Sequence, residues 1–362
     1  MNRLPTNGSN ILFLALIIHC SVSCNTKTNP STEPDQLQYE LVTIDSLLRD
    51  TAFALYMAKS LDSAYYAGIG EVAPEFLTTD ENTAVISKPL KEEKIAINLA
   101  GFYALECGVG LLCSQTNQTP VEWLHKIKNG TADPNAVLLL NRLANATWKA
   151  GQPFRGLGRI TRYNFTVAGL LSDDEVKMDS VQIANAAAKL LTSMDTVSKK
   201  PLPEQMEILR NLLQDTLYAV QMAAWLDSAY AISQEQIPLP FIAVSDDTAT
   251  ITKQVKEMKI ATSIAGFYAL ECGLNYLVTT KKMLPSTILK SIVNDSISKE
   301  DKLIFARFAN ATWKAGQPFR GLNRITRQTF TPFYFLNESD IDKDMVQIKM
   351  AAQRLLVRLN LP

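Results

Sequence analysis

Apolar residues recur at every third or fourth position over long stretches of the chain, a spacing typical of amphipathic helices. The runs 204–231 and 253–278 show it most clearly, and Pro203 suits the first turn of a helix. Alternating apolar and polar residues, which would indicate strands, are limited to two short candidates at 161–171 and 248–255. The pattern therefore predicts an all-α fold of packed helices.

The helical pattern occurs twice along the chain. The sequence "AGFYALECG" at 100–108 returns unchanged at 265–273, and residues 50–67 correspond to residues 215–232. The same offset separates every matched pair of segments, so the two halves align without gaps. A fixed period of this kind indicates a duplicated structural unit. We therefore predict two tandem homologous helical-bundle units of about five to six helices each.

One block of the repeat is almost unchanged between its two copies. Residues 144–166 and 309–331 agree at 20 of 23 positions, whereas 109–141 and 274–306 agree at 6 of 33. A recent duplication alone would leave the differences spread more evenly, so some constraint acts on this block. Either an internal network of contacts or a binding site would provide that constraint.

Within the block, the Gly-Gln-Pro sequence at 151–153 predicts the end of one helix and the start of a short second one. At about 100° per residue, three arginines then share one side of the short helix and three apolar residues share the opposite side. The arginines are Arg155, Arg159 and Arg162 in the first copy and Arg320, Arg324 and Arg327 in the second, and the apolar residues are Phe154, Leu157 and Ile160, then Phe319, Leu322 and Ile325.

Three guanidinium groups on one face repel each other unless anions meet them. The chain has its own acids at matching positions, Asp62 with Asp227 and Glu106 with Glu271. Internal arginine–carboxylate pairs would also explain why Glu106 stands within an apolar helix. Alternatively the anion is external: a phosphate, a carboxylated or sulfated glycan, a lipid head group or an acidic partner surface. A third hypothesis makes the same acids the catalytic carboxylates of a hydrolase that acts on envelope glycans.

Aromatic, amide and cationic side chains also accompany the arginines. Asn145 and Lys149 are four residues apart, so they share one face of a helix close to Trp148. Such a group suits a sugar-like ligand, and it equally suits a tightly packed helix corner. The candidate binding set is Asn145, Trp148, Lys149, Arg155, Arg159 and Arg162, with Asn310, Trp313, Lys314, Arg320, Arg324 and Arg327 at the matching positions.

Charge and residue types narrow the possible chemistry. Lys plus Arg and Asp plus Glu both number 36, so there is no basic field that would favour nucleic acid. The only histidine outside the leader, His125, is matched by Lys290, and no clusters of metal ligands or glycine-rich phosphate loops are visible. We therefore predict no metal, no cofactor and no catalytic residues of these classes.

The cysteines do not form a disulfide framework in the sequence pattern. Cys107 and Cys272 occupy equivalent positions, whereas Cys113 is matched by Val278. Cys107 and Cys272 would be able to pair across a twofold axis. The favoured interpretation is that they are small buried apolar residues.

The N-terminus has the features of an export signal. The apolar stretch "ILFLALII" at 11–18 is too short to span a bilayer and fits a secretory signal. It leads to "SVSC", which ends at Cys24 and resembles the lipobox of bacterial lipoproteins. The resemblance implies cleavage before Cys24, lipidation of that residue and attachment to a membrane of the cell envelope. The polar stretch that follows is typical of a flexible tether. It has no acidic run after the cysteine, and this favours an outer-membrane anchor facing the periplasm.

Together these features predict a non-enzymatic envelope lipoprotein that binds or scaffolds through paired arginine and tryptophan surfaces. The expected partners are the membrane, through the lipid anchor, and an anionic small molecule, glycan or protein. A glycan hydrolase and a purely structural duplicated scaffold with internal salt bridges are the alternatives. The expected segments are a signal peptide at 1–23, a tether at 24–36, a first unit at 37–196, a linker at 197–202 and a second unit at 203–362.

Overall fold

Helices make up most of the chain in the computed structural model, as the apolar spacing predicted. The signal region and Cys24 lie outside the described residues. The structure describes residues 32–68, 70, 83–89, 96–162, 164–194, 196, 198–215, 217–219, 221–222, 226, 232, 248–254, 261–321 and 324–359.

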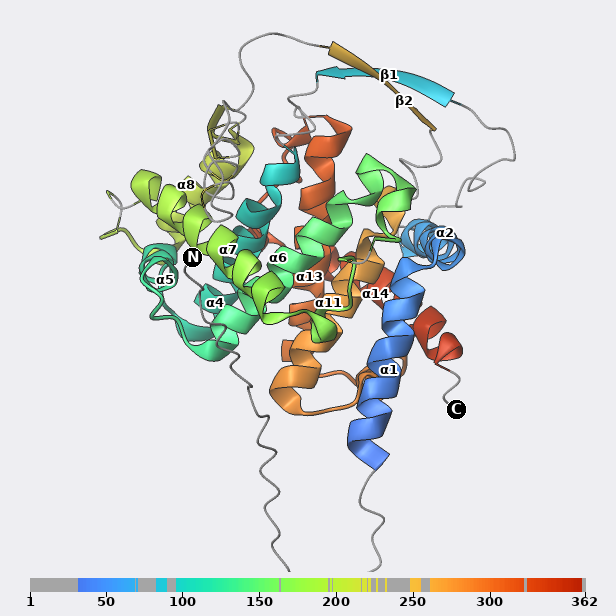
Figure 1. The fold of residues 1–362 in the computed structure, drawn as a ribbon. Helices are drawn as coiled ribbons and strands as arrows, with labels where there is room; N and C mark the ends of the chain where they lie inside the picture. Colours follow the sequence, from blue (N-terminus) through green and yellow to red (C-terminus); the bar gives the residue numbers. More distant parts are fainter. Residues whose placement is uncertain are drawn as a thin grey trace, which may run out of the picture.

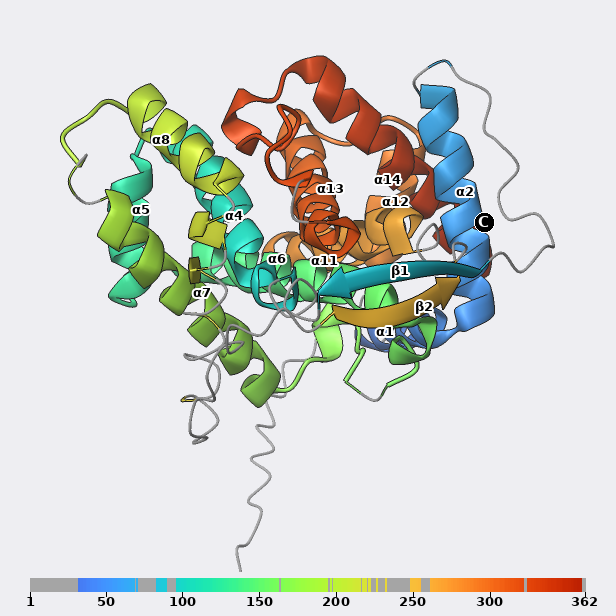
Figure 2. The ribbon, with the colours of Figure 1, turned by 90° about the horizontal axis from the view of Figure 1, so that it is seen from above.

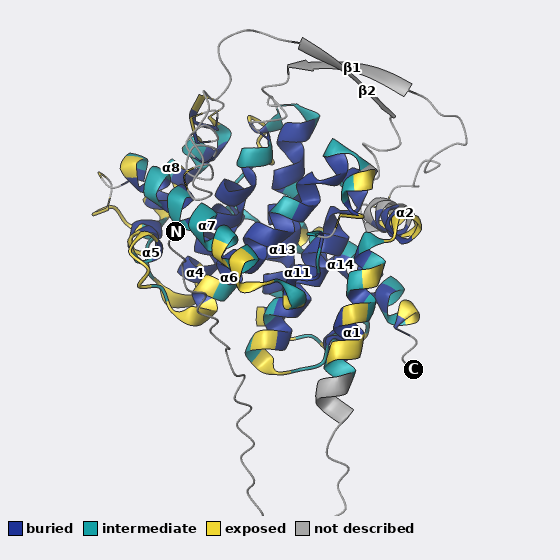
Figure 3. Ribbon diagram, viewed as in Figure 1, coloured by how far each residue is buried: buried dark blue, intermediate teal, exposed yellow. Residues whose placement is uncertain are grey.

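Four helices form the centre of the molecule (Figure 1). Two of them, α6 and α13, pack against each other, and α4 and α11 each pack against both. Their buried residues belong to one continuous apolar cluster that draws on both halves of the sequence, visible as the dark interior of Figure 3. The four are α4 (Ala100–Thr116), α6 (Pro134–Gly151), α11 (Ala265–Lys281) and α13 (Lys299–Arg320).

Capping interactions fix where several helices begin. Ser172 and Glu175 exchange hydrogen bonds in a capping box, and the Ser298 hydroxyl accepts the backbone N–H of Asp301. Thr119 forms a further capping box at the start of a short helix. The outer helices are α1 (Thr32–Arg49), α2 (Thr51–Gly68), α5 (Pro120–Lys128), α7 (Asp173–Met194), α8 (Leu202–Gln214), α12 (Pro285–Val293) and α14 (Glu338–Arg358).

The first helices of each half, α1, α2 and α8, pack on partners from the opposite half of the sequence. α1 packs on α12 and α2 on α14, while α8 packs on α5 and α7. Hydrogen bonds also join these helices to the opposite half. The carboxylate of Glu40 accepts hydrogen bonds from the backbone N–H and the hydroxyl of Ser286, and the side chain of Gln205 accepts one from the backbone N–H of Val121. Glu40 and Gln205 occupy matching positions of the repeat, as do Val121 and Ser286.

A two-stranded antiparallel ribbon is the exception to the helical fold. β1 (Thr83–Pro89) pairs with β2 (Thr248–Gln254), and Ile86 stands opposite Ile251 at the centre of the register. The ribbon crosses one end of the molecule, near the ends of α6 and α13 (Figures 1 and 2). The sequence candidate at 248–255 is therefore a strand. The candidate at 161–171 is not, because its regular structure is a 3₁₀ turn, η3, at Ala168–Leu170.

Candidate functional site

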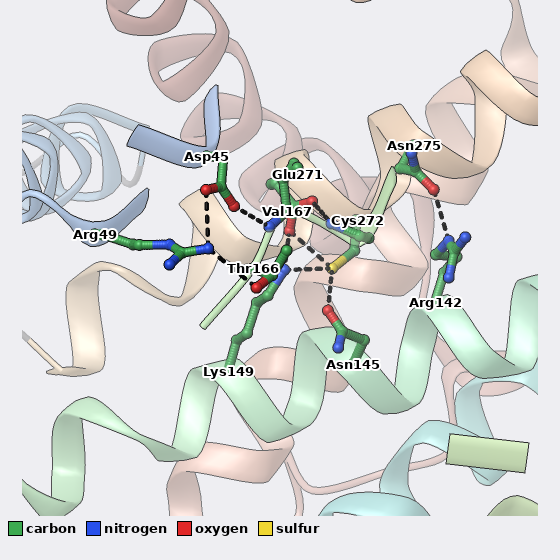
Figure 4. A network of polar contacts seen from close by, with 11 residues as sticks. Asp45, Arg49, Arg142, Asn145, Lys149, Thr166, Val167, Glu271, Cys272 and Asn275 are labelled. Carbon is green, nitrogen blue, oxygen red and sulfur yellow. Dashed lines mark hydrogen bonds and ion pairs between the residues drawn. The ribbon is translucent and has the colours of Figure 1, made fainter. Parts of the chain in front are cut away.

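Two buried ion pairs join the halves of the chain. Lys149 on α6 pairs with Glu271 on α11 at 2.5 Å, and Lys314 on α13 pairs with Glu106 on α4 (Figure 4 shows the first pair). All four side chains are fully buried. Because the two lysines occupy matching positions of the repeat, as do the two glutamates, the same contact is made twice in opposite directions.

Each glutamate is held by further hydrogen bonds. The Oε1 of Glu271 accepts the backbone N–H of Ala168, at 2.6 Å, and its Oε2 lies 3.1 Å from the Sγ of Cys272. The same thiol lies 3.6 Å from Oδ1 of Asn145. The equivalent contacts surround the second glutamate. There the backbone N–H of Phe333 donates to Glu106 at 3.1 Å, and the thiol of Cys107 lies 3.2 Å from Glu106 and 3.6 Å from Asn310.

Burial and the neighbouring charges shift the pKa values of the lysine and of the two thiols in these clusters. Burial by itself lowers the pKa of Lys149, but the pKa is raised overall because the ammonium is paired with the Glu271 carboxylate. Burial and the neighbouring glutamate raise the pKa of the Cys107 and Cys272 thiols, so both remain protonated at neutral pH. Both cysteines are free, in agreement with the prediction of small buried residues.

These pairs correct the predicted arginine–glutamate network. Lysines, not arginines, neutralise Glu106 and Glu271, because the lysine stands on the inward face of the helix that precedes the arginines. A carboxylate sealed in this way cannot reach a glycan, so neither glutamate suits the hydrolase alternative. The side chain of Asp62 and the whole of Asp227 lie outside the described residues.

Several candidate binding residues are not accessible to a ligand. Asn145, Lys149, Asn310 and Lys314 are buried and engaged in the contacts between the halves, which removes them from the binding set. Trp148 and Trp313 are half-buried and pack on Phe165 and Phe330, with ring centroids 5.9 Å apart in each case. The sequence pattern placed these residues correctly on helices but did not reveal which side of each helix meets the other half.

The two nearly identical segments, 144–166 and 309–331, contact each other through a phenylalanine from each. The rings of Phe154 and Phe319 stack with centroids 5.3 Å apart and an interplanar angle of 8°. A Cβ added to Gly151 would lie 3.0 Å from the Phe319 ring, and one added to Gly316 would lie 3.0 Å from the Phe154 ring. The glycines of the Gly-Gln-Pro sequence therefore make room for this stack.

The predicted short helix after the stack is only partly present. In the first copy α6 ends at Gly151, and two 3₁₀ turns follow, η1 (Pro153–Arg155) and η2 (Leu157–Arg159). In the second copy α13 continues through Pro318 to Arg320, contrary to the predicted helix end. Positive φ angles of 134° at Gly156 and 137° at Gly321 stop the chain from continuing as one helix.

The arginines nevertheless lie toward the surface, with apolar residues behind them. Ile160 and Ile325 are fully buried, whereas Arg162 and Arg327 are exposed. Arg155, Arg159, Arg320 and Arg324 are half-buried. Burial lowers the pKa of Arg320, as do the nearby charges of Arg324 and Arg327. The three arginines of the second copy are therefore close enough to repel each other.

Several buried or half-buried polar residues at matching positions were not predicted from the sequence. Arg142 donates from Nε to the Oδ1 of Asn275 at 2.6 Å, and Arg307 is its equivalent in the second half. Burial raises the pKa of Asp179 and of its equivalent Asp344 to about 7. The recurrence of an arginine and an aspartate at the same offset was the available signal.

Comparison of the chain with protein-family models, with curated proteins and with solved structures finds no match. Among the described residues one segment, Ala96–Thr116, is long and apolar enough to cross a membrane, and 89% of its most apolar stretch is buried inside the molecule. Among the described residues no group of His, Cys, Asp or Glu has the arrangement of a metal site. The case for a function therefore depends on the arginines and on the contacts between the halves.

Proposed function

We propose that this protein is a lipid-anchored component of a bacterial cell envelope that binds phosphate- or carboxylate-bearing ligands through arginines at the surface. The binding face comprises Arg320, Arg324 and Arg327, called the arginine face below. It has no need of a catalytic group, and the protein acts as a binding or scaffolding module. The matching arginines of the first copy, Arg155, Arg159 and Arg162, form a second and weaker face.

The observation that supports this proposal is the lack of compensating charge at the arginine face. Among the described residues, no ion pair includes Arg320, Arg324 or Arg327, and two of the four acids that were expected to neutralise the arginines, Glu106 and Glu271, are paired with lysines. Guanidinium groups that repel each other are stabilised when an anion accepts hydrogen bonds from more than one of them. The first copy differs, because Arg155 and Arg159 make contacts of their own.

The test is binding of two anionic polymers, inorganic polyphosphate and polygalacturonate, with uncharged dextran as the negative probe. A variant carrying Arg320→Gln, Arg324→Gln and Arg327→Gln should lose roughly tenfold or more in affinity, because each lost charged hydrogen bond contributes about 1.5–3 kcal/mol. The matched control carries Lys128→Gln, Lys177→Gln and Lys290→Gln, three exposed positions elsewhere. Equal affinities of the two variants, with both folded by circular dichroism, would overturn the proposal.

The lipid anchor is tested separately. Mass spectrometry of the mature N-terminus from a bacterial host should find a diacylated or triacylated Cys24. The Cys24→Ser variant should keep its leader and lose the membrane fraction. A wild-type chain that is cleaved elsewhere or carries no lipid contradicts the anchoring part of the proposal and leaves the arginine face unaffected.

A second candidate function is a structural scaffold formed by duplication. We infer that the chain contains two homologous helical-bundle units, each of which completes the packing of the other. The reciprocal pairs of Lys149 with Glu271 and Lys314 with Glu106 support this inference, as does the stack of Phe154 on Phe319. This candidate accounts for the invariance of the buried residues. It does not account for the recurrence of surface arginines, and for that reason we favour the binding function.

A further inference from the structure

The two segments that carry the surface arginines follow the same backbone course. In the first copy the backbone N–H groups of Arg159 and Arg162 each donate to the carbonyl three residues earlier, at 3.0 and 3.4 Å. In the second copy the matching N–H groups of Arg324 and Arg327 do the same, at 3.1 and 3.4 Å. Each segment therefore turns in the same way after its positive-φ glycine and presents its arginines from equivalent positions.

Contacts between equivalent residues locate a twofold axis at this end of the molecule. Phe154 stacks on its own counterpart Phe319, with the ring planes 8° from parallel. At the centre of the ribbon Ile86 stands opposite Ile251, and these two residues are also counterparts. A residue contacts its own counterpart only close to the axis that relates the two halves. The ribbon lies near the ends of α6 and α13 (Figures 1 and 2), so the axis leaves the molecule between the two arginine segments.

The phenylalanine stack also limits the distance between the two sets of arginines. Arg155 and Arg320 directly follow the stacked phenylalanines, whose ring centroids are 5.3 Å apart. A phenylalanine ring centroid lies about 4 Å from its own Cα and neighbouring Cα atoms are about 3.8 Å apart, so the Cα atoms of Arg155 and Arg320 lie within about 21 Å of each other. The arginine face and the weaker face (Arg155, Arg159 and Arg162) therefore flank one axis, within reach of a single extended ligand.

Both segments contribute cations and no anions to this end of the molecule. The sequence has no Asp or Glu from Gly151 to Ser172 or from Gly316 to Asn337. Arg162, the exposed arginine of the weaker face, takes part in no ion pair among the residues that the structure describes. The positive potentials of the two faces therefore add near the axis, and an anionic group there is attracted by both.

We propose that the two faces together bind one linear polyanion, a polymer that carries a phosphate or carboxylate group in every unit. This inference rests on the proposed function of the arginine face, and it adds the weaker face and the polymeric nature of the ligand. A polymer held at one face is present at a high effective concentration at the other. Because it is flexible, it passes beside the ribbon. Joint binding also explains why the surface arginines recur in both copies, which a single independent site would not require.

The test compares long-chain polyphosphate with inorganic phosphate as ligands of the full-length protein. Arg159→Gln with Arg162→Gln removes two charges from the weaker face, and Lys128→Gln with Lys290→Gln removes two exposed charges elsewhere as the control. If both faces hold one chain, the weaker-face variant should lose roughly 100-fold or more in affinity for the polymer, and the lysine control should lose far less. Its affinity for inorganic phosphate should stay unchanged, because a single anion gains nothing from a second face.

Independent faces predict a different result. The arginine face alone would then set the affinity for the polymer, so the weaker-face variant would bind the polymer as tightly as the wild type. That outcome overturns the joint binding and leaves the proposed function of the arginine face intact. An equal loss for the polymer and for inorganic phosphate also contradicts joint binding. A wild-type protein that binds neither ligand removes the proposed function and this inference with it.

Two further measurements sharpen the comparison. Arg162→Gln alone changes only an exposed side chain, and it should lower the affinity for the polymer by a smaller factor in the same direction. A fixed polymer length is used throughout, because a long polymer offers many registers even to one face and the wild type and variants share this advantage. Polygalacturonate in place of polyphosphate distinguishes the two ligand groups, since the polymer with the larger loss carries the group that both faces contact. A loss for neither polymer overturns the proposal.

Discussion

The two buried clusters of this protein resemble each other at their centre and differ at their edge. Each has a lysine, a glutamate, an asparagine and a cysteine in the same mutual contacts. One step outward, Asn275 and Ala168 in one cluster are replaced by Gly110 and Phe333 in the other. The charged pair and its nearest polar neighbours are the same in both clusters, whereas other residues that also join the halves, such as Asn275 and Ala168, differ between them. The two clusters thus share the ion pair itself and differ in the contacts around it.

The largest expected effect comes from breaking one lysine–glutamate pair. Glu271→Gln should destabilise the protein by about 3–5 kcal/mol, because it leaves the buried Lys149 ammonium without a counter-charge. Adding Lys149→Met should recover much of this loss, since the glutamine still accepts the Ala168 amide. Chemical denaturation of the two single variants and the double variant measures the coupling. The Glu106→Gln and Lys314→Met set should give the same result, and unequal coupling would break the equivalence of the clusters.

The matching glycines Gly108 and Gly273 should differ in how much stability is lost when each is replaced by alanine. A Cβ on Gly273 would lie 2.8 Å from the rigid ring of Phe305, whereas a Cβ on Gly108 would lie 2.4 Å from a terminal methyl group of Leu140. The methyl group of Leu140 can move aside when the leucine changes rotamer, whereas the packed ring of Phe305 cannot move as easily. Gly273→Ala should therefore lower the free energy of unfolding by about 1–3 kcal/mol, and Gly108→Ala by less. Urea denaturation of both variants compares the costs. A larger loss for Gly108→Ala would show that Leu140 cannot move.

A smaller effect is expected at the edge of the first cluster. Asn275→Ala removes the acceptor of Arg142 and makes the first cluster resemble the second, at a cost of about 1–2 kcal/mol. The loss should be absent in an Arg142→Met background, where nothing needs the acceptor. If Asn275→Ala is neutral in both backgrounds, the hydrogen bond does not distinguish the two clusters.

A separate effect is expected on the pH dependence of stability. Burial raises the pKa of Asp179 and Asp344 to about 7, whereas an unfolded chain ionises aspartate at about 4. Between these values the folded state holds more protons than the unfolded state, so the free energy of unfolding falls as the pH rises from 4 to 7. Asp179→Asn and Asp344→Asn should each flatten this slope. Denaturation at pH 5, 6, 7 and 8 in constant chloride tests it, and an unchanged slope in both variants would contradict the assigned groups.

Parts of the candidate site were predictable because they depend on local periodicity. Helical spacing placed Asn145 and Lys149 on one face, and the structure agrees. Ile160 is buried and Arg162 exposed as expected, although two 3₁₀ turns replace the predicted short helix. Which residue neutralises Glu106 was not predictable. Arginine and lysine were both available at matching positions, and the answer depends on how α4 crosses α13. The predicted end of a helix at Gln317–Pro318 was wrong for a similar reason, since packing keeps α13 helical beyond the proline.

The sequence by itself determined that the chain is mostly helical and that its pattern repeats at a constant offset. It also determined that one block of the repeat is under unusual constraint. Only the tertiary structure decided which residues of that block join the two halves, because Lys149 and Glu271 are 122 residues apart in the chain. The same holds for the exchange of outer helices between the halves. Periodicity reports which face of a helix is apolar, whereas the choice of partner for that face depends on the summed contacts of every helix in the molecule.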